Sequence, residues 1–325
     1  MSYTTIDDAS QYFNTVIWTG NNGTARNITG VGHQPDFVWI KHRNGGSGHH
    51  MYDSVRGVEK RLRSDTNAAE SSVTNGLTAF DSDGFEVGNN SATNGGGNTF
   101  VAWCWKEDTT AGFDIISYTG STSSQDISHG LGVKPDWILN KITTTTGDWN
   151  VYHDSFALNE RIKLNSSGAK NTNASIFDAL PDSSVIHIGT SGDINTDGAT
   201  HVFWAWRAVK GFSSFGSYVG NGSSTDGTYV HLGFRPAFVI RRRTDSGNSW
   251  GMNDNKRNTF NITENLLLAD SASAAGDGTG IDLLSNGFKM RTNSSLHNAS
   301  GGTYIYMAFA ESPFVNSKGI PTNAR

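Results

Sequence analysis

The chain has 325 residues, a formal net charge of −5, one cysteine and only 17% charged residues. A single cysteine excludes an intrachain disulfide, and the mild acidity argues against a nucleic-acid partner, which would require a clustered basic surface. No apolar run approaches the ~20 residues that span a bilayer, so we expect no membrane insertion. The N-terminal run lacks a basic region followed by an apolar one, so we expect no Sec signal and synthesis in the cytoplasm.

The chain aligns with itself at a shift of about 100 residues. The run QPDFV (34–38) recurs as KPDWI (134–138) and RPAFV (235–239), and each is followed by a cation: Lys41, Lys141 and Arg242. Each copy ends in a similar run, TFVAWCW (99–105), THVFWAW (200–206) or TYIYMAF (303–309). This period is far longer than that of a solenoid, so each copy should be a domain. We place the domains at 1–109, 110–210 and 211–325, the last with a C-terminal tail.

Alternation of apolar and polar residues predicts strands within each copy. In the middle copy they cover 113–118, 136–141, 149–153, 161–164, 185–189 and the closing run 200–206. In the first closing run, Val101, Trp103 and Trp105 should face a core, whereas Phe100 and its alternating neighbours should be half covered. Only 68–70 and 273–275 suggest a helical turn.

The turns between these strands are rich in Gly, Asn, Ser and Asp, which is typical of antiparallel hairpins. The sequence therefore predicts an all-β protein of three tandem antiparallel β-sandwich domains, of jelly-roll or lectin-like kind. A closed barrel is the alternative.

No catalytic, cofactor-binding or metal-binding set is predicted. The run 193–198 matches half of a calcium loop, but Trp204 stands where that loop requires a glutamate. The run 81–84 is predicted as a turn, and His49 and His50 lack further ligands at zinc spacing. Cys104 aligns with alanines and should be a packed residue rather than a nucleophile. The basic run 241–243 is predicted to be a solvated strand end.

Aromatic residues are the remaining candidates for contact with a ligand or partner, because aromatic rings bind sugars and protein surfaces. Trp149 and Trp250 align with each other and each begins a strand, and Tyr152, Tyr229 and His231 are further candidates for exposure. For each of them a place in a domain core is favoured, because three small cores need most of the aromatic residues, and contact with a ligand or partner is the alternative.

Several runs resemble a family of tail-fibre-like or lectin-like virion structural proteins of marine tailed bacteriophages. They are MSYTTIDDASQYF, QPDFVWIKHR, DSVRGVEKRL, FDSDGFEVG and TFVAWCWK in the first copy, and GFRPAFVIRRR and GGTYIYMAFAESPFVNSKGIPTNAR in the third. The resemblance covers nearly the whole chain and is weakest in the middle copy. It brings no established catalytic or metal residue.

The resemblance implies a non-enzymatic protein of the virion, made in the host cytoplasm and exposed on a tail fibre, baseplate or capsid. Its partners would be other virion proteins and further copies of itself, as a homo-oligomer. A carbohydrate-binding adhesin that recognises a host surface glycan is the alternative, and a glycan hydrolase is a third hypothesis.

Overall fold

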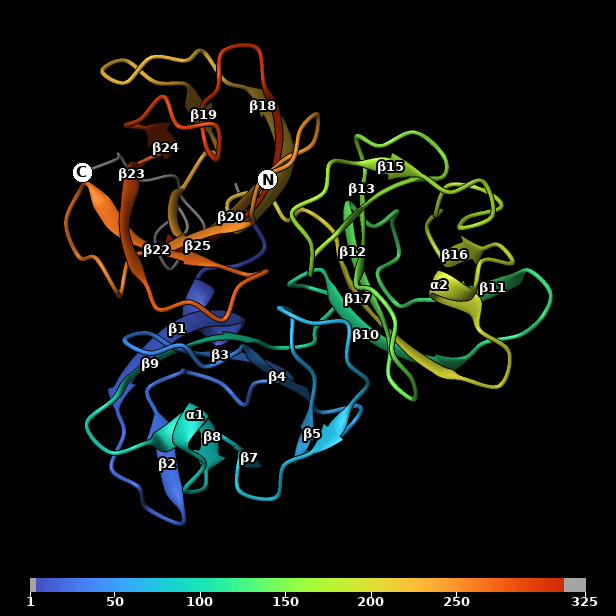
Figure 1. The fold of residues 1–325 in the computed structure, drawn as a ribbon, viewed down its shortest axis with the longest axis horizontal. Coiled ribbons are helices and arrows are strands. Elements are labelled where there is room, and N and C mark those ends of the chain that lie inside the picture. Colours follow the sequence, from blue (N-terminus) through green and yellow to red (C-terminus); the bar gives the residue numbers. More distant parts are fainter. Residues whose placement is uncertain (1–3, 313–325) are drawn as a thin grey trace.

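Short antiparallel strands dominate residues 4–312, the part of the chain that the structure, a computed structural model, describes. Their β-branched and aromatic residues favour extended backbone, and their glycine-rich turns allow sharp reversals. We call residues 1–109, 110–210 and 211–325 repeats 1, 2 and 3. The repeats form three lobes around a common centre, in blue, green and orange (Figure 1). The fold is all-β, as predicted.

Most strands recur in the same order in each repeat. Repeat 1 contains η1 (Ala9–Gln11), β1 (Phe13–Thr19), β2 (Arg26–Thr29), β3 (Phe37–His42), β4 (His50–Asp53), β5 (Lys60–Arg61), β6 (Ser71–Ser72), β7 (Leu77–Asp81), β8 (Gly84–Val87), α1 (Ser91–Asn94) and β9 (Thr99–Trp105). Repeat 2 contains β10 (Phe113–Thr119), β11 (Gln125–Ser128), β12 (Trp137–Ile142), β13 (Asn150–His153), β14 (Glu160–Lys163), β15 (Asn171–Thr172), β16 (Val185–Ile188), α2 (Gly192–Asn195) and β17 (Thr200–Trp206). Repeat 3 contains β18 (Ser213–Val219), β19 (Tyr229–His231), β20 (Arg235–Arg243), β21 (Gly251–Asp254), β22 (Thr263–Leu268), β23 (Gly276–Leu284), β24 (Gly287–Met290) and β25 (Thr303–Ser312).

The closing strand of each repeat lies inside a main antiparallel sheet. The orders are β1-β9-β3-β4 in repeat 1, β10-β17-β12-β13 in repeat 2 and β18-β25-β20-β21 in repeat 3. The registers correspond: Trp103 pairs with Thr15 and Trp39, and Trp204 pairs with Ile115 and Leu139. The three main sheets are therefore equivalent structures.

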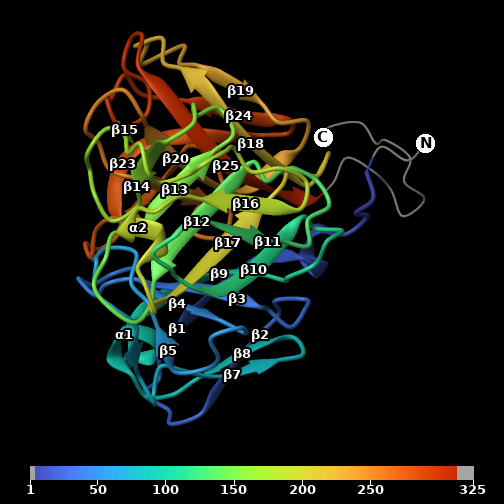
Figure 2. The same cartoon turned by 90° about the vertical axis from the view of Figure 1, so that its right-hand side faces the viewer.

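A smaller group of strands covers the outer face of each main sheet. It is β2-β8-β7 in repeat 1, β11-β16 in repeat 2 and β19-β24-β23 in repeat 3. In repeat 3 the two groups join through β22 into one sheet of eight strands, which curls into a nearly closed barrel. Figure 1 shows β11 and β16 at the rim of repeat 2, farther from the centre than β10, β12 and β17, and Figure 2 views repeat 2 from that outer side.

Both faces of each closing strand are buried. Val101, Trp103 and Trp105 point into a core that all three repeats share. On the opposite face, Phe100 and Cys104 are 0% exposed and pack beneath the small sheet of their own repeat. The expectation that this second face is half covered is therefore wrong, because a second sheet covers it.

Aromatic rings cross the boundaries between repeats in the shared core. Phe13 of repeat 1 stacks on Phe309 of repeat 3 with ring centroids 4.8 Å apart. Phe37 of repeat 1 lies 5.5 Å from Trp204 of repeat 2, and Trp137 of repeat 2 meets Trp250 of repeat 3 edge-on at 5.8 Å. Offset and edge-on pairs of this kind add stability beyond area burial.

The strands predicted in the middle copy are confirmed to within a residue or two at their ends. No helical turn forms at 68–70 or 273–275. The short turns α1 and α2 form instead, where the side chains of Asn90 and Ser191 accept the backbone N–H two residues on. In the described part of the chain, no helix has the length and apolarity needed to cross a membrane.

Candidate functional site

Trp149 and Trp250 lie in the seams between repeats and are 0% exposed. Trp149 of repeat 2 donates its indole Nε1–H to the carbonyl oxygen of Arg63 in repeat 1, at 2.8 Å. Trp250 of repeat 3 donates to the carbonyl oxygen of Lys163 in repeat 2, at 2.9 Å. This burial leaves neither ring a surface for an external ligand, and both join one repeat to the next.

His49 occupies the equivalent position in repeat 1. Its Nε2 lies 2.9 Å from the carbonyl oxygen of Leu268 in repeat 3, and its Nδ1 lies 2.8 Å from the indole Nε1 of Trp39. Because the indole can only donate, Nδ1 accepts, and the protonated Nε2 donates a hydrogen bond to the carbonyl oxygen of Leu268. Burial, with a contribution from Lys41, lowers the pKa of His49 to about 4, which keeps the ring neutral.

These three contacts close a ring: repeat 1 binds repeat 3, repeat 3 binds repeat 2, and repeat 2 binds repeat 1. The sequence comparison detected the two tryptophans but missed His49. The three equivalent positions share a ring N–H donor, which both imidazole and indole provide. They do not share a residue type, so a comparison of residue identities could not detect the match.

Backbone hydrogen bonds form a second ring in the same seams. The amide of Glu70 donates to Thr143 at 2.8 Å, and the amide of Lys170 donates to Thr244 at 2.9 Å. The amide of Ala275 donates to Arg43 at 2.7 Å and completes the ring. Each seam therefore has two types of polar contact, one from an aromatic side-chain N–H group and one from the backbone alone.

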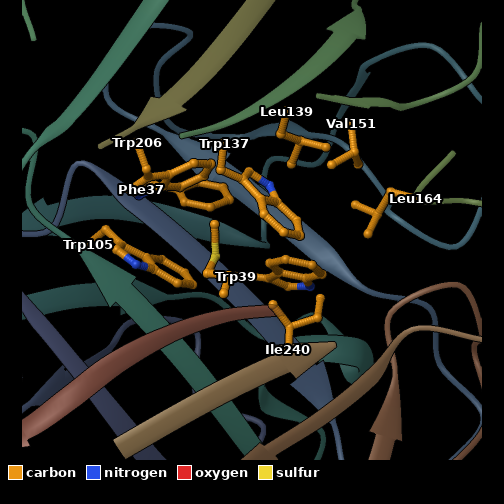
Figure 3. A pocket seen from close by; sticks show the side chains of 10 residues that line it. Phe37, Trp39, Trp105, Trp137, Leu139, Val151, Leu164, Trp206 and Ile240 are labelled. Carbon is orange, nitrogen blue, oxygen red and sulfur yellow. The ribbon is translucent and has the colours of Figure 1, made fainter. Parts of the chain in front are cut away.

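A cavity of about 20 Å³ lies within the shared core. Figure 3 shows aromatic rings and aliphatic side chains from all three repeats converging on it. Its lining is Phe37, Trp39, Trp105, Trp137, Leu139, Val151, Leu164, Trp206, Ile240 and Met307. This apolar lining offers a bound molecule almost no hydrogen-bond partner, and the cavity is only large enough for about one water molecule. The cavity is a packing gap rather than a ligand pocket.

The lysines that recur after the proline motif are buried at the seams. Lys41 donates from Nζ to the carbonyl oxygens of His42 at 2.7 Å and Ala272 of repeat 3 at 3.2 Å. Lys141 donates to the carbonyl oxygen of Ile142 at 2.6 Å. Desolvation lowers the pKa of each ammonium to about 8. Both cations donate to backbone carbonyls of the chain.

The prediction that 241–243 is a solvated strand end is wrong for Arg241 and Arg242, which are both 0% exposed. Arg241 donates from Nε to Nδ1 of His297 at 2.9 Å. Arg242 donates to the carbonyl oxygen of Gly168 in repeat 2 and lies over the ring of Trp250, 5.7 Å from its centroid. These adjacent residues point to opposite faces of β20. Both faces are covered, so both charges lie in the interior, beside an imidazole for Arg241 and beside a carbonyl and an indole ring for Arg242.

The other aromatic candidates separate into two environments. Tyr152 is 2% exposed and meets Phe177 edge-on at 5.7 Å in the outer core of repeat 2. Tyr229 on β19 is 42% exposed, and His231 beside it is also exposed. The Tyr229 hydroxyl lies 3.2 Å from Nδ1 of His231. Of the five candidates, only this pair offers an aromatic surface to solvent.

The remaining polar candidates have structural partners. Asp83 accepts the amides of Gly30 and Gly32 at 3.0 and 2.7 Å in the predicted turn, and these bonds lower the pKa of its carboxyl. Asp193 forms an ion pair with Arg161 at 2.7 Å. Burial raises the pKa of the Cys104 thiol. Within residues 4–312, no three His, Cys, Asp or Glu side chains are placed to hold a metal ion.

Comparison with known families matches residues 8–313 to a family described as a domain of unknown function, DUF7483. No curated protein matches the chain. No solved structure matches it either.

Proposed function

The chain belongs to the DUF7483 family, and we propose that it is a non-enzymatic structural protein exposed on a phage particle, at a tail fibre, baseplate or capsid surface. The observation that carries the proposal is the double ring of seam contacts, through His49, Trp149 and Trp250 and through the backbone. Two cyclic sets of bonds around an aromatic core hold the three lobes in one rigid arrangement. Such a body suits a part that bears load in an assembly.

In this proposal each repeat is a sandwich of lectin-like or jelly-roll kind whose main sheet faces the centre. The outer strands and loops remain available for other virion proteins and for further copies of the chain. Repeat 3 carries a strongly exposed apolar residue, Phe260, with an exposed fraction of 83%, and Ile262 close by at 43%. Exposed apolar residues are favoured where a partner covers them.

The proposal is tested on purified particles of the phage that encodes the chain. Antibodies against the recombinant protein should label intact particles, and the protein should co-purify with them at a fixed ratio to the major capsid protein. A Phe260→Ser variant should fold normally and incorporate less well, whereas the matched surface variant Val133→Ser should incorporate normally. Absence of the protein from purified particles would overturn the proposal.

A second candidate function is carbohydrate binding by the exposed pair Tyr229 and His231. A half-exposed phenol ring beside an imidazole offers a stacking surface and a polar group, which is the combination that sugar rings use. A glycan array probed with the wild type and with Tyr229→Ala tests it. Signals that Tyr229→Ala leaves unchanged would place any sugar binding elsewhere.

A further inference from the structure

A pocket of about 140 Å³ opens beside β5 and β6 in repeat 1. Its walls are Arg61, Arg63, Thr66, Ala68, Ala69 and Ser71. Two guanidinium groups and two hydroxyl groups thus border one small space. This composition differs from the apolar cavity of the shared core.

The two arginines differ in how their charge is compensated. Arg63 pairs with Asp65, with 2.5 Å between Nη2 and Oδ2. Arg61 donates from Nε to the hydroxyl of Ser71 at 3.1 Å. Among the described side chains, no carboxylate lies within ion-pair distance of Arg61. The pocket therefore carries one uncompensated positive charge.

Repeat 2 shows how the equivalent arginine is neutralised. Arg161 donates from Nε to Asn171, the counterpart of Ser71, at 3.3 Å. Its Nη1 donates to Oδ1 of Asn150 at 2.6 Å and pairs with Asp193 at 2.7 Å. Asn150 and Asp193 thus supply an acceptor and a counter-charge within the chain.

In repeat 1 both of these partners are replaced. His50 begins β4 where Asn150 begins β13, and Ala92 stands in α1 where Asp193 stands in α2. His50 is buried, and burial together with Arg61 and Arg63 lowers its pKa to about 3, so its ring is neutral and supplies no counter-charge to Arg61. The same arginine is kept while its counter-charge is lost.

The pocket also contains an unused polar atom. The buried hydroxyl oxygen of Thr66 has no hydrogen-bond partner among the described residues. A guanidinium group presents a planar fork of donors that matches the oxygens of a carboxylate or sulfate, and such charge-assisted bonds are strong. A ligand oxygen could meet both groups.

We propose that this pocket binds the carboxylate or sulfate group of a small ligand, with Arg61 as the principal contact and Arg63, Thr66 and Ser71 as supporting contacts. The anion supplies Arg61 with the counter-charge that Asp193 supplies to Arg161 in repeat 2. The proposal is independent of the structural role proposed above. A free ion and an acidic saccharide both carry such a group, and the recognised chemistry is the same.

Isothermal titration at constant ionic strength tests the proposal, with sodium sulfate, sodium glucuronate and neutral glucose as probes. Wild type should bind sulfate or glucuronate saturably, and glucose should not bind. Arg61→Gln should weaken binding by at least about tenfold, because it removes charge-assisted bonds. Tighter binding of glucuronate than of sulfate would identify the saccharide as the source, and the reverse would identify the free ion.

Ala92→Asp is the sharper variant, because it gives repeat 1 the counter-charge of repeat 2 and should abolish anion binding without disturbing the fold. Two matched variants control for general electrostatics: Lys60→Gln, next to Arg61, and Ser91→Asp, next to Ala92. Both should bind like the wild type. Failure of the wild type to bind either anion, or unchanged binding by Arg61→Gln and Ala92→Asp, would overturn the proposal.

Discussion

The buried indole ring of Trp149 makes one hydrogen bond across the seam, from its Nε1–H group. Trp149→Phe removes the N–H donor, leaves the Arg63 carbonyl without this partner and opens a small void. Both effects destabilise, and we expect a loss of about 2–4 kcal/mol in the free energy of unfolding. Urea denaturation followed by circular dichroism measures it. The exposed control Tyr229→Phe should change stability by less than about 0.5 kcal/mol, and an equal loss in both would refute the seam role.

Asp254 and Arg257 form an ion pair that is 0% exposed at both side chains, with 2.5 Å between Oδ2 and Nε. Arg257 also lies over Trp103 of repeat 1, 5.6 Å from its ring centroid. Arg257→Met leaves a buried carboxylate without its cation, and we expect a cost of about 3–5 kcal/mol. Thermal and chemical unfolding should agree on the size of this loss.

Repeat 2 provides the compensating variant. At the equivalent positions it has His153 and Phe156, whose ring centroids lie 5.7 Å apart. The double variant Asp254→His/Arg257→Phe should therefore be more stable than Arg257→Met alone, because it removes both charges together. A double variant that unfolds at lower denaturant than the single one would show that the two solutions are not interchangeable.

At the scale of elements, a glycine ends the first strand of each main sheet. A Cβ atom on Gly20 would lie 2.1 Å from the carbonyl oxygen of Gly95, and one on Gly120 would lie 2.1 Å from that of Thr196. The turn that follows the short helix approaches the strand end at these points. Gly20→Ala should destabilise the protein by about 1–3 kcal/mol, since backbone must move. Gly46→Ala, which meets nothing within 4 Å, is the control, and differential scanning calorimetry distinguishes them.

The sequence predicted individual strands well because their alternation is a local property. The same alternation could not show what lies across from each face. Trp103 and Phe100 are both aromatic, but Trp103 faces the core shared with repeats 2 and 3, whereas Phe100 faces the small sheet of repeat 1. Likewise, Arg241 and Arg242 looked solvated because charge is normally exposed, and only the tertiary arrangement supplies the partners that bury them.

The candidate site shows the same division. Alignment correctly paired Trp149 with Trp250, but the acceptors Arg63 and Lys163 are backbone carbonyls, which no side-chain pattern reveals. The unbalanced charge of Arg61 depends on two substitutions far away in the sequence, at His50 and Ala92. The loss of the counter-charge becomes visible only when the equivalent strands of repeats 1 and 2 are superposed.

For the whole molecule, buried histidines make stability depend on pH. The pKa is lowered to about 4 for His49, His153 and His201 and to about 3 for His50, chiefly by burial. The unfolded chain takes up protons near its ordinary histidine pKa of ~6.5, before the folded protein does. Stability should therefore be full above that pH and decline as pH falls towards 4, by on the order of 1.4 kcal/mol per unit for each histidine.

Urea denaturation at pH 7, 6 and 5 measures this decline. His201→Phe gives repeat 2 the residue that repeat 1 carries at the equivalent position, Phe100. The free energy of unfolding of the variant should fall less steeply with decreasing pH, because about one proton fewer is taken up on unfolding. Its stability relative to the wild type should therefore improve as the pH falls. Parallel curves of unfolding free energy against pH for the two proteins would show that His201 has the same pKa in the folded and the unfolded state.

The ring of seam contacts also bears on how such a chain could arise. Two repeats alone would leave one aromatic face and one set of carbonyl acceptors uncovered, whereas three repeats satisfy every seam. Three separate one-repeat polypeptides could satisfy the same seams as a homotrimer. The geometry thus favours an ancestral homotrimer whose single gene was triplicated and fused, after which each copy could change on its own. The His153 and Phe156 pair and the unmatched Arg61 are the kind of difference that only a fused chain can carry at one position out of three.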